Sequence, residues 1–519
     1  MNRWLFLLAA LAALQIAGLS TAKRPKQLPR QDILLLQQEL IQQEKKRHQW
    51  PASPPRQNST TQYSPMQAGF DVLHYDIDLD IDPVAEMISG TVAAKCSLVA
   101  SNVTHLGFNL FSNMTVRDVT ASGQPISFVH ADDMVAAENN GGYVAGDTVT
   151  IVIDYFGTPD SIGRFNPFTF ATHGPQDAPT IFSISAPYYA GTWWPCKDVP
   201  GDKATANIHI TTPDNLVTAS NGRLMDVVDL SNGKHRYEWE ESYAISTYLI
   251  SVAVADYVVF SDYYKYGPND SMEVMYFVYP EDSVKAREDF NVTVSLLELY
   301  SSIFGPYPFL QEKYGMAEAK WGGLAMEHQT CTTYGSSLVT GTHQNDRIIA
   351  HELAHQWWGD LVTVGDWRDI WLNEGFATYA EALWKENTEG IAAYRDFMNS
   401  RDIQSGFKGS IYDPDDLYNL TVYWKGAWVL HMLRHVLGDS VFFQALRDYT
   451  EAHAYGNALT EDFQYACESI WGQSLELFFR QWVYGSGRPH YQYSWVQYLL
   501  ADGHYVSCEV KQVQPEGSP

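Results

Sequence analysis

The chain has 519 residues, of which 45% are hydrophobic and 14% aromatic, so it can build several apolar cores. At roughly 100–200 residues per domain, about three domains are expected. The formal net charge of −27 argues against nucleic acid as a partner, because phosphate backbones are bound by basic surfaces. An acidic surface favours solubility and basic or N-terminally charged ligands.

Residues 1–22 have the pattern of a secretion signal. Arg3 gives a positive start, the apolar run "WLFLLAALAALQIAGL" follows, and small residues end at Ala22. A retained anchor is the alternative, but the apolar run is shorter than the ~20 residues that a spanning helix needs. We therefore expect cleavage near Ala22, a secreted or periplasmic protein, and no stable membrane span after cleavage.

The next segments predict a mobile leader and then an all-β domain. Within residues 23–65, "DILLLQQELIQQEKKRHQW" is compatible with one amphipathic helix, and "PASPPRQNSTTQYSP" resembles a linker. From residue 70, "YDIDLDID" alternates apolar and acidic residues, which indicates a half-buried strand. Similar runs, such as "TVTIVIDYF", "NIHITTP" and "YLISVAVADYVVF", continue to about residue 260. We expect an N-terminal β-domain over residues 66–278.

Helical periodicity dominates from about residue 281 to 484, which predicts a mainly α domain over residues 279–488. Strand-like text returns in "YQYSWVQYLL" and "YVSCEVKQVQ", so residues 489–519 are expected to form a partial β segment. The five cysteines are widely spaced and contain no CxxC pair, which argues against a cysteine zinc site.

The run "IIAHELAHQWWGDLV", residues 348–362, carries two histidines four residues apart. On an α-helix, His351 and His355 lie on one face and present their imidazoles to a common point. Glu352 lies about 100° round the helix from His351, where it can flank that point without being a ligand. This spacing is that of a zinc metalloprotease helix. Two histidines that merely occupy a helix are the alternative.

A catalytic zinc usually takes three protein ligands, and "DIWLNEGFATYAEALW" offers the third. Glu374 follows His355 after 18 intervening residues and lies in a second helical pattern. Asn373 is a residue type that can begin such a helix. Two helices packed together would bring Glu374 to the open side of the histidine pair. One zinc ion per chain, held by His351, His355 and Glu374, is therefore expected.

With these residues in place, the chain resembles the membrane alanyl aminopeptidase (aminopeptidase N) family of gluzincin zinc metallopeptidases. "AHELAHQWWGDLVT" with "WLNEGFATYAE" matches the family's HExxH pattern, eighteen residues and a glutamate. "TWWPCKDVPGDKATANIHITTP", "FGPYPF", "MEHQT", "YWKGAWVLHMLRHVLG" and "FFRQWVYGSGRP" match further motifs in the family's order. The resemblance covers about residues 66–514. It implies a saddle-like N-terminal β-domain followed by a thermolysin-like catalytic domain.

The resemblance also assigns roles. It implies a zinc-dependent aminopeptidase that removes N-terminal residues from peptides, with Glu352 as general base on zinc-bound water. Tyr423, which precedes "WKG", would stabilise the oxyanion. In the family, a Gly-x-Met-Glu-Asn segment supplies a glutamate that captures the substrate's α-ammonium. Glu327 would take that part here, and Ala325 and Met326 would line the substrate.

Three positions depart from the family's pattern. Leu324 stands where glycine is usual and His328 where asparagine is usual. Ala186 stands where relatives carry a second Glu or Gln that touches the amine. Losing one charged hydrogen bond would weaken amine anchoring by ~1.5–3 kcal/mol. A zinc endopeptidase or mixed-specificity peptidase with a relaxed need for a free N-terminus is therefore the alternative function.

The C-terminal part raises a further alternative. Longer family members carry another small β-domain and a large C-terminal helical domain that caps the cavity, whereas residues 489–519 have room for the start of a β-domain alone. The resemblance thus implies a short form with a more open cleft, or a truncated product. A non-catalytic peptide-binding relative is the third candidate, although His351, Glu352, His355, Glu374 and Tyr423 are all present.

Overall fold

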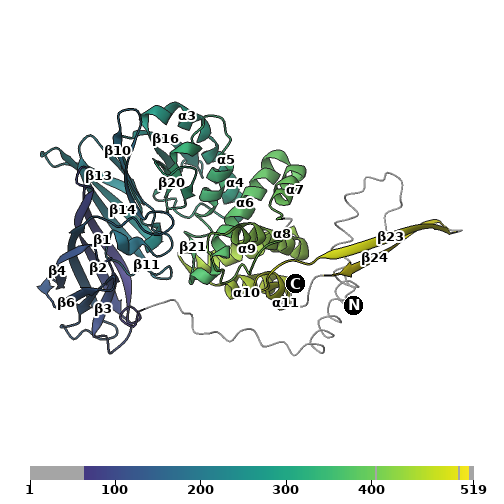
Figure 1. Ribbon diagram of the computed structural model, residues 1–519, viewed down its shortest axis with the longest axis horizontal. Helices are drawn as coiled ribbons and strands as arrows, with labels where there is room; N and C mark the ends of the chain where they lie inside the picture. The colour runs from purple at the N-terminus through teal and green to yellow at the C-terminus, as the bar shows by residue number, and fades with distance from the viewer. Residues whose placement is uncertain (1–63, 404–405, 501–502, 514–519) are drawn as a thin grey trace. The chain divides into compact units, whose positions relative to one another are not determined.

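The computed structural model describes residues 64–403, 406–500 and 503–513. The expected signal peptide and nearly all of the expected leader lie outside these ranges. The described residues form two units, a large body that ends at Gly487 and a hairpin that begins at Arg488 (Figure 1). Within the described ranges, no helix is both long enough and apolar enough to cross a membrane.

The N-terminal part is built on an eight-stranded sheet with the order β13-β14-β11-β1-β2-β8-β4-β5. The central strand β1 buries Tyr75, Ile77 and Leu79 and leaves the intervening aspartates half-buried, as its period-2 pattern predicts. Basic side chains on β14 pair with those aspartates across the sheet. The strands are β1 (Phe70–Asp82), β2 (Met87–Leu98), β4 (Thr115–Ala121), β5 (Gln124–Pro125), β8 (Thr148–Gly157), β11 (Lys203–Pro213), β13 (Arg223–Asp229) and β14 (Lys234–Ser246).

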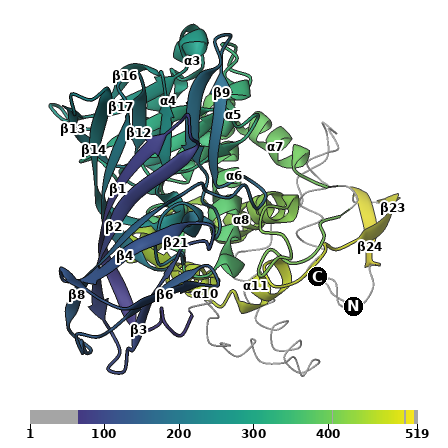
Figure 2. The ribbon, with the colours of Figure 1, turned by 60° about the vertical axis from the view of Figure 1, so that its left-hand side comes forward.

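Two smaller sheets complete the β-rich part, and buried residues between 70 and 255 form its core. A four-stranded sheet has the order β12-β15-β10-β9, and a three-stranded sheet has the order β3-β7-β6. Their strands are β3 (His105–Asn109), β6 (Phe128–Ala131), β7 (Met134–Glu138), β9 (Phe168–His173), β10 (Ala178–Ser183), β12 (Val217–Ser220) and β15 (Val252–Ala255). In Figure 2, β9 and β12 lie in the upper half of the view and β3 and β6 lie at its bottom.

The part that the sequence analysis expects to be catalytic, called the catalytic part from here on, contains a mixed five-stranded sheet, of which strands β18, β19 and β20 were not predicted from the periodicity of the sequence. Its order is β16-β17-β18-β20-β19, with β16 (Val258–Lys265), β17 (Ser271–Val278), β18 (Lys313–Ala319), β19 (Ala325–Met326) and β20 (Cys331–Gly335). Residues 258–278, which the sequence analysis assigned to the N-terminal domain, therefore pair with strands of the catalytic part. β18 and β20 are buried along their whole length, so they show no alternation that would indicate a strand.

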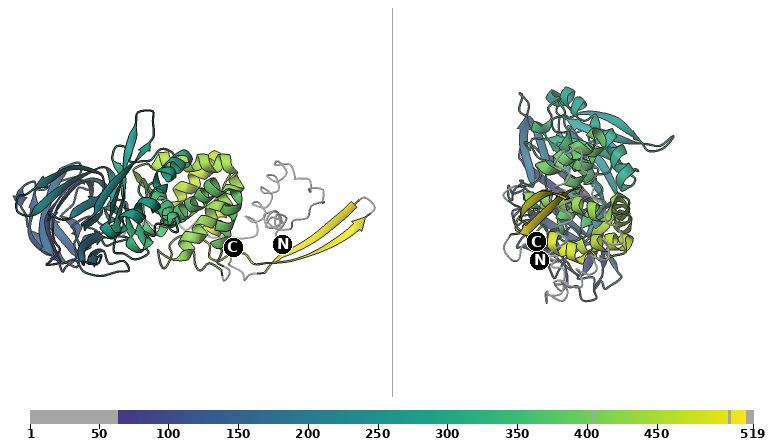
Figure 3. Two further views of the ribbon diagram at one scale, coloured as in Figure 1. Left: turned by 90° about the horizontal axis from the view of Figure 1, so that it is seen from above. Right: turned by 90° about the vertical axis from the view of Figure 1, so that its right-hand side faces the viewer.

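Helices make up most of the rest of the large body, and the green to yellow-green ones lie at the end opposite to the N-terminal sheets (Figure 3). They are α3 (Ser283–Asp289), α4 (Val292–Phe304), α5 (Asp346–Ala354), α6 (Trp371–Glu389), α7 (Ile391–Ser400), α8 (Gly426–Leu437), α9 (Asp439–His453), α10 (Thr460–Trp471) and α11 (Glu476–Trp482). A two-stranded parallel sheet joins β21 (Val362–Val364) to β22 (Gly456–Ala458). A mainly α catalytic part after an all-β part confirms the expected fold class.

A close helix crossing positions part of the candidate site. A Cβ atom on Gly375 would lie 2.9 Å from the Cα atom of Gly426, so α6 and α8 meet through their backbones. A π-helical turn, Thr421–Lys425, leads directly into α8. The crossing therefore sets Glu374, one residue before Gly375, beside the turn that carries Tyr423. Substituting either glycine would force the two helices apart.

The C-terminal hairpin pairs β23 (Tyr491–Leu500) with β24 (Gly503–Gln512) in an antiparallel register. This agrees with the strand-like text in the sequence. One face carries Tyr493, Trp495, Leu499 and Val506, all of which are exposed.

Candidate metal centre and substrate cavity

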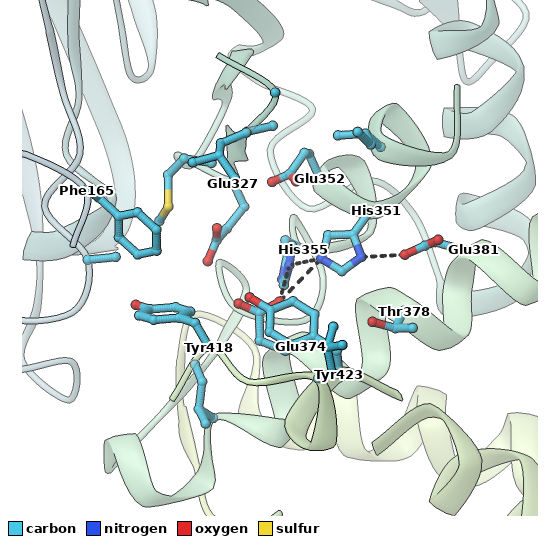
Figure 4. A pocket seen from close by; sticks show the side chains of 18 of the residues that line it. Phe165, Glu327, His351, Glu352, His355, Glu374, Thr378, Glu381, Tyr418 and Tyr423 are labelled. Atoms are coloured by element: carbon cyan, nitrogen blue, oxygen red, sulfur yellow. Dashed lines mark hydrogen bonds and ion pairs between the residues drawn. The ribbon is translucent and has the colours of Figure 1, made fainter. Parts of the chain in front are cut away.

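Three donor atoms converge at the centre of the site, and they come from two helices packed face to face. α5 supplies His351 and, at its C-terminal end, His355, whereas the first turn of α6 supplies Glu374 (Figure 4). The two histidine Nε2 atoms lie 3.2 Å apart. Glu374 Oε2 lies 3.3 Å from Nε2 of His351 and 3.4 Å from Nε2 of His355.

These distances fit zinc. Ligand atoms 2.0–2.1 Å from a tetrahedral zinc lie about 3.3 Å from one another, which is the spacing of this triangle. Two imidazoles and one carboxylate are also a ligand set that catalytic zinc uses, with the fourth position left open. His351, His355 and Glu374, which were predicted as ligands, are thus brought together by the fold.

Neighbouring groups fix the orientation of both imidazoles. His351 Nδ1 lies 2.8 Å from Oε1 of Glu381, and His355 Nδ1 lies 2.9 Å from the carbonyl oxygen of Trp358. A partner that accepts a hydrogen bond at Nδ1 leaves Nε2 as the free donor of electrons to a metal. Glu381 lies seven residues after Glu374, and hence on the same face of α6. That spacing would have identified it from the sequence, but the sequence analysis missed it.

The electrostatics of the cluster favour positive charge at its centre. Burial disfavours charged imidazoles, yet the nearby carboxylates outweigh burial and raise the pKa of His351 to about 9 and that of His355 to about 10. Burial opposes ionisation of Glu374 as well, but the two histidines prevail and hold its pKa at about 2. A divalent cation between the three groups would supply this positive charge.

Three further predicted residues, Glu327, Glu352 and Tyr423, flank the cluster. Glu352 is 6% exposed, and burial raises the pKa of its carboxyl to about 7. Glu327, Glu352 and His355 each bring one ligand atom within 4.8 Å of the others. The Tyr423 ring stacks on the His351 ring with their centroids 6.0 Å apart, and burial raises the pKa of its phenol. Tyr423 therefore keeps its proton at neutral pH and remains a hydrogen-bond donor.

These groups line a cavity of about 450 Å³ between the N-terminal and catalytic parts. Glu327 lies in it next to the short strand β19, together with Ala325 and Met326. Leu324 also lines the cavity and is 48% exposed. Ala186 reaches the cavity from the N-terminal part. It was predicted to stand where relatives place a second amine-binding side chain, and its methyl group supplies no polar atom there.

His328 differs from its neighbours because it does not line the cavity. It is fully buried, its Nδ1 lies 2.9 Å from Oγ1 of Thr333, and its Nε2 has no hydrogen-bond partner among the described residues.

Asn373 was expected to begin the helix that carries Glu374, and this expectation is wrong. α6 begins at Trp371, so Asn373 lies inside the first turn and does not cap the helix. Its side chain instead donates to the Tyr248 hydroxyl at 3.4 Å.

Aromatic side chains that the sequence analysis did not single out cover the Glu327 end of the cavity. The Phe165 ring lies 5.1 Å from that of Tyr418 and 5.6 Å from that of Trp321. Figure 4 shows Phe165 and Tyr418 on the Glu327 side of the metal cluster. Phe165 lies in a loop of the N-terminal part, and neither its type nor its spacing singled it out. Arg164 beside it pairs with Asp416 of the catalytic part at 3.1 Å.

Comparison with known protein families agrees with this geometry. Residues 72–249 match the peptidase M1 N-terminal domain, and residues 288–482 match the peptidase family M1 domain. Together the two ranges cover well over half of the chain. The protein therefore belongs to the peptidase M1 family, which confirms the resemblance seen in the sequence.

Relatives and solved structures extend the comparison. The chain is 28% identical to Aminopeptidase M1 of Arabidopsis thaliana over 86% of its own length and 53% of that protein. It is 27% identical to Aminopeptidase N of Lactobacillus delbrueckii subsp. lactis over 83% of its length and 52% of that protein. The chain thus spans about half the length of these curated relatives.

Two solved structures match over nearly their whole length. A two-domain M1 zinc metallopeptidase bound to L-arginine aligns with a TM-score of 0.70 and 27% identity, covering 81% of this chain and 95% of that one. An M1 zinc metallopeptidase from Deinococcus radiodurans, bound to a Tyr-Ser-Ala substrate, aligns with a TM-score of 0.68 and 27% identity, covering 80% and 94%.

Proposed function

We propose that the protein is a zinc-dependent aminopeptidase that hydrolyses the first peptide bond of peptides with a free N-terminus. The observation that carries this proposal is the triangle of His351 Nε2, His355 Nε2 and Glu374 Oε2, with sides of 3.2, 3.3 and 3.4 Å, in the cavity that also holds Glu327. The matched relatives are aminopeptidases and zinc metallopeptidases, which supports the same activity.

Zinc held by the three ligands would polarise the scissile carbonyl and lower the pKa of a coordinated water to about 7. Glu352 is placed to accept the proton of the attacking water and later to deliver it to the leaving amine, because it flanks the ligands without belonging to their triangle. Tyr423, protonated at neutral pH, would donate a hydrogen bond to the oxyanion that develops on the carbonyl.

Glu327 would select substrates by their N-terminus. Its carboxylate is 7% exposed and lies within 4.8 Å of His355 and Glu352, so it can pair with an α-ammonium one residue before the scissile amide. The aromatic rings of Phe165 and Tyr418 would border the first side chain of the substrate on that side. In the matched solved structures, L-arginine and the tripeptide Tyr-Ser-Ala are the bound ligands, which supports amino acids and short peptides as ligands here.

Loss of the second amine-binding group favours a second candidate, a peptidase with a relaxed need for a free N-terminus. Ala186 lines the cavity with a methyl group, and the exposed Leu324 adds bulk beside the substrate path. Glu327 then anchors the amine without a partner from the N-terminal part, and anchoring weakens by ~1.5–3 kcal/mol.

One experiment separates the two candidates. Zinc-loaded protein is given a peptide and its N-acetylated twin, and cleavage is followed by mass spectrometry with and without chelator. An aminopeptidase cleaves the free peptide alone and stops when zinc is removed. Comparable cleavage of the capped peptide would establish the relaxed specificity. Chelator-resistant cleavage, or none of either peptide, would refute both.

We also propose that the protein is exported and that its first 22 residues are removed. The basic start, the apolar run and the small residues before Ala22 support this. N-terminal sequencing of protein made in its native host tests it, and a mature chain that begins at Met1 would refute it.

A further inference from the structure

The two ends of the cavity differ in charge, and the proposed function gives a role only to the end that holds Glu327. Figure 4 shows Glu327 on one side of the metal cluster and Glu381 on the other, with His351 and His355 between them. The Glu327 end is acidic and suits an ammonium group. The Glu381 end also carries the guanidinium groups of Arg347 and Arg401, both of which line the cavity.

At that end two cations share one carboxylate. Arg347 Nη1 lies 3.0 Å from Oε2 of Glu381, and Arg401 Nη2 lies 3.8 Å from the same atom. The other carboxylate oxygen, Oε1, is engaged by His351. Both carboxylate oxygens of Glu381 are therefore engaged. Among the residues that line the cavity, Arg401 pairs with no carboxylate other than this shared one.

Arg401 packs against two aromatic rings. Its guanidinium lies over the Phe397 ring at 4.4 Å and over the Trp424 ring at 5.3 Å, and its side chain is 16% exposed. Its Nε atom is buried and makes no hydrogen bond within the described part of the chain. A guanidinium that lines the cavity and shares its one carboxylate partner with a second arginine is a group that a planar carboxylate can bind.

The direction of the substrate follows from the proposed function, on which this inference rests. With the α-ammonium at Glu327 and the scissile amide at the metal cluster, the second residue extends toward Glu381. An extended residue spans about 3.3–3.6 Å, so the carboxylate of a dipeptide ends just beyond the cluster on the arginine side. We propose that Arg401 and Arg347 form a subsite for the free α-carboxylate of a dipeptide, so that the enzyme prefers dipeptides to their amides.

The test measures binding without turnover. Zinc-loaded protein carrying Glu352→Gln is titrated calorimetrically with Ala-Ala and with Ala-Ala-amide, which differ at the terminal carboxylate. We expect the acid to bind about tenfold more tightly than the amide, as a partly solvated charged hydrogen bond predicts. Adding Arg401→Met should bring the ratio of the two dissociation constants close to one, and Arg401→Lys should restore part of it.

Arg395→Met is the matched control, because it removes an exposed arginine from α7, the helix that ends directly before Arg401. The preference should persist in that variant. Arg347→Met provides a second variant. The Arg347 side chain is 45% exposed, so its replacement leaves the packing around Arg401 in place. An equal affinity for acid and amide in the parent, or an unchanged ratio in both Arg401→Met and Arg347→Met, would overturn the subsite.

A separate assay keeps the two proposals distinct. Alanine p-nitroanilide carries no carboxylate, so its hydrolysis by the unsubstituted enzyme reports the proposed function alone. Hydrolysis of the anilide without any acid preference would overturn the subsite and leave the aminopeptidase standing. Failure to hydrolyse the anilide with zinc bound would overturn both.

Discussion

Two buried clusters of charged groups lie in the large body, and they have opposite designs. In the metal cluster, His351, His355 and Glu374 form one group of close ligand atoms, and Glu327 and Glu352 form a second group with His355; all five residues line the cavity. A second cluster lies between the N-terminal and catalytic parts, where Lys313 and Glu241 are both buried.

The second cluster, which we call the interdomain cluster, consists of Lys203, Glu241, Lys313, Thr330 and Asp360. Lys313 Nζ donates to the carbonyl oxygens of Ser220 at 2.8 Å and Thr330 at 3.0 Å. Glu241 accepts from the Thr330 hydroxyl at 3.3 Å, and Lys203 donates to the carbonyl oxygen of Asp360 at 2.6 Å. Burial lowers the pKa of Lys203 to about 7 and also lowers that of Lys313.

The comparison shows how buried charge can be assigned to structure or to function. The interdomain cluster contains its own cations, and backbone carbonyls of both parts accept hydrogen bonds from them, so the cluster joins the two parts. The metal cluster contains an excess of carboxylates that face a cavity, so it demands a cation from outside. Substitutions in the metal cluster should therefore change activity without changing stability. Substitutions in the interdomain cluster should change stability without changing activity.

Removing the general base should have the largest effect. Glu352→Gln should lower kcat by about 10³–10⁴, because proton transfer loses its acceptor. The midpoint of urea unfolding should not fall, because burial already disfavours the charged form of Glu352. Steady-state kinetics and urea titration of the zinc-loaded variant measure both quantities. A variant that retains a tenth of the parental kcat would remove Glu352 from the mechanism.

Breaking the interdomain cluster should give the opposite result. Lys313→Met should lower the free energy of unfolding by about 3 kcal/mol, because two buried backbone carbonyls lose their charged hydrogen-bond donor. Zinc content per folded chain should stay the same. Lys320→Met, an exposed lysine at the end of β18, should change stability by less than about 0.5 kcal/mol. Equal effects of the two substitutions in urea titrations would contradict the role given to this cluster.

A smaller effect should appear as a pH dependence at His328. Burial lowers the pKa of His328 to about 3, whereas an unfolded histidine has a pKa of about 6.5. Between these values the unfolded chain binds a proton that the folded chain does not, so stability falls as the pH drops from 7 to 5. Relative to His328→Asn, the parent should lose about 2 kcal/mol over that interval.

Urea titrations of both proteins at pH 5 and pH 7 measure this difference. His504→Asn, which removes an exposed imidazole, should leave the pH dependence as it is in the parent. A stability difference between the parent and His328→Asn that does not change with pH would show that the imidazole is not held neutral.

Much of the site was predictable because its signals are local. The i, i+4 spacing of His351 and His355 and the helical pattern around Glu374 gave the metal ligands, and period-2 alternation gave strands such as β1. Strands β18 and β20 of the catalytic part were not predictable from periodicity, because they are buried on both faces. The Arg401 end of the cavity depends on tertiary packing between α7 and the turn that carries Tyr423, which no short-range pattern encodes.

The metal content of the purified protein tests the central claim most directly. After dialysis against trace zinc, mass spectrometry should find one zinc per chain in the parent and in Lys313→Met, and far less in His355→Ala at the same folded concentration. Folded parent protein without zinc, or undiminished zinc in His355→Ala, would contradict the account.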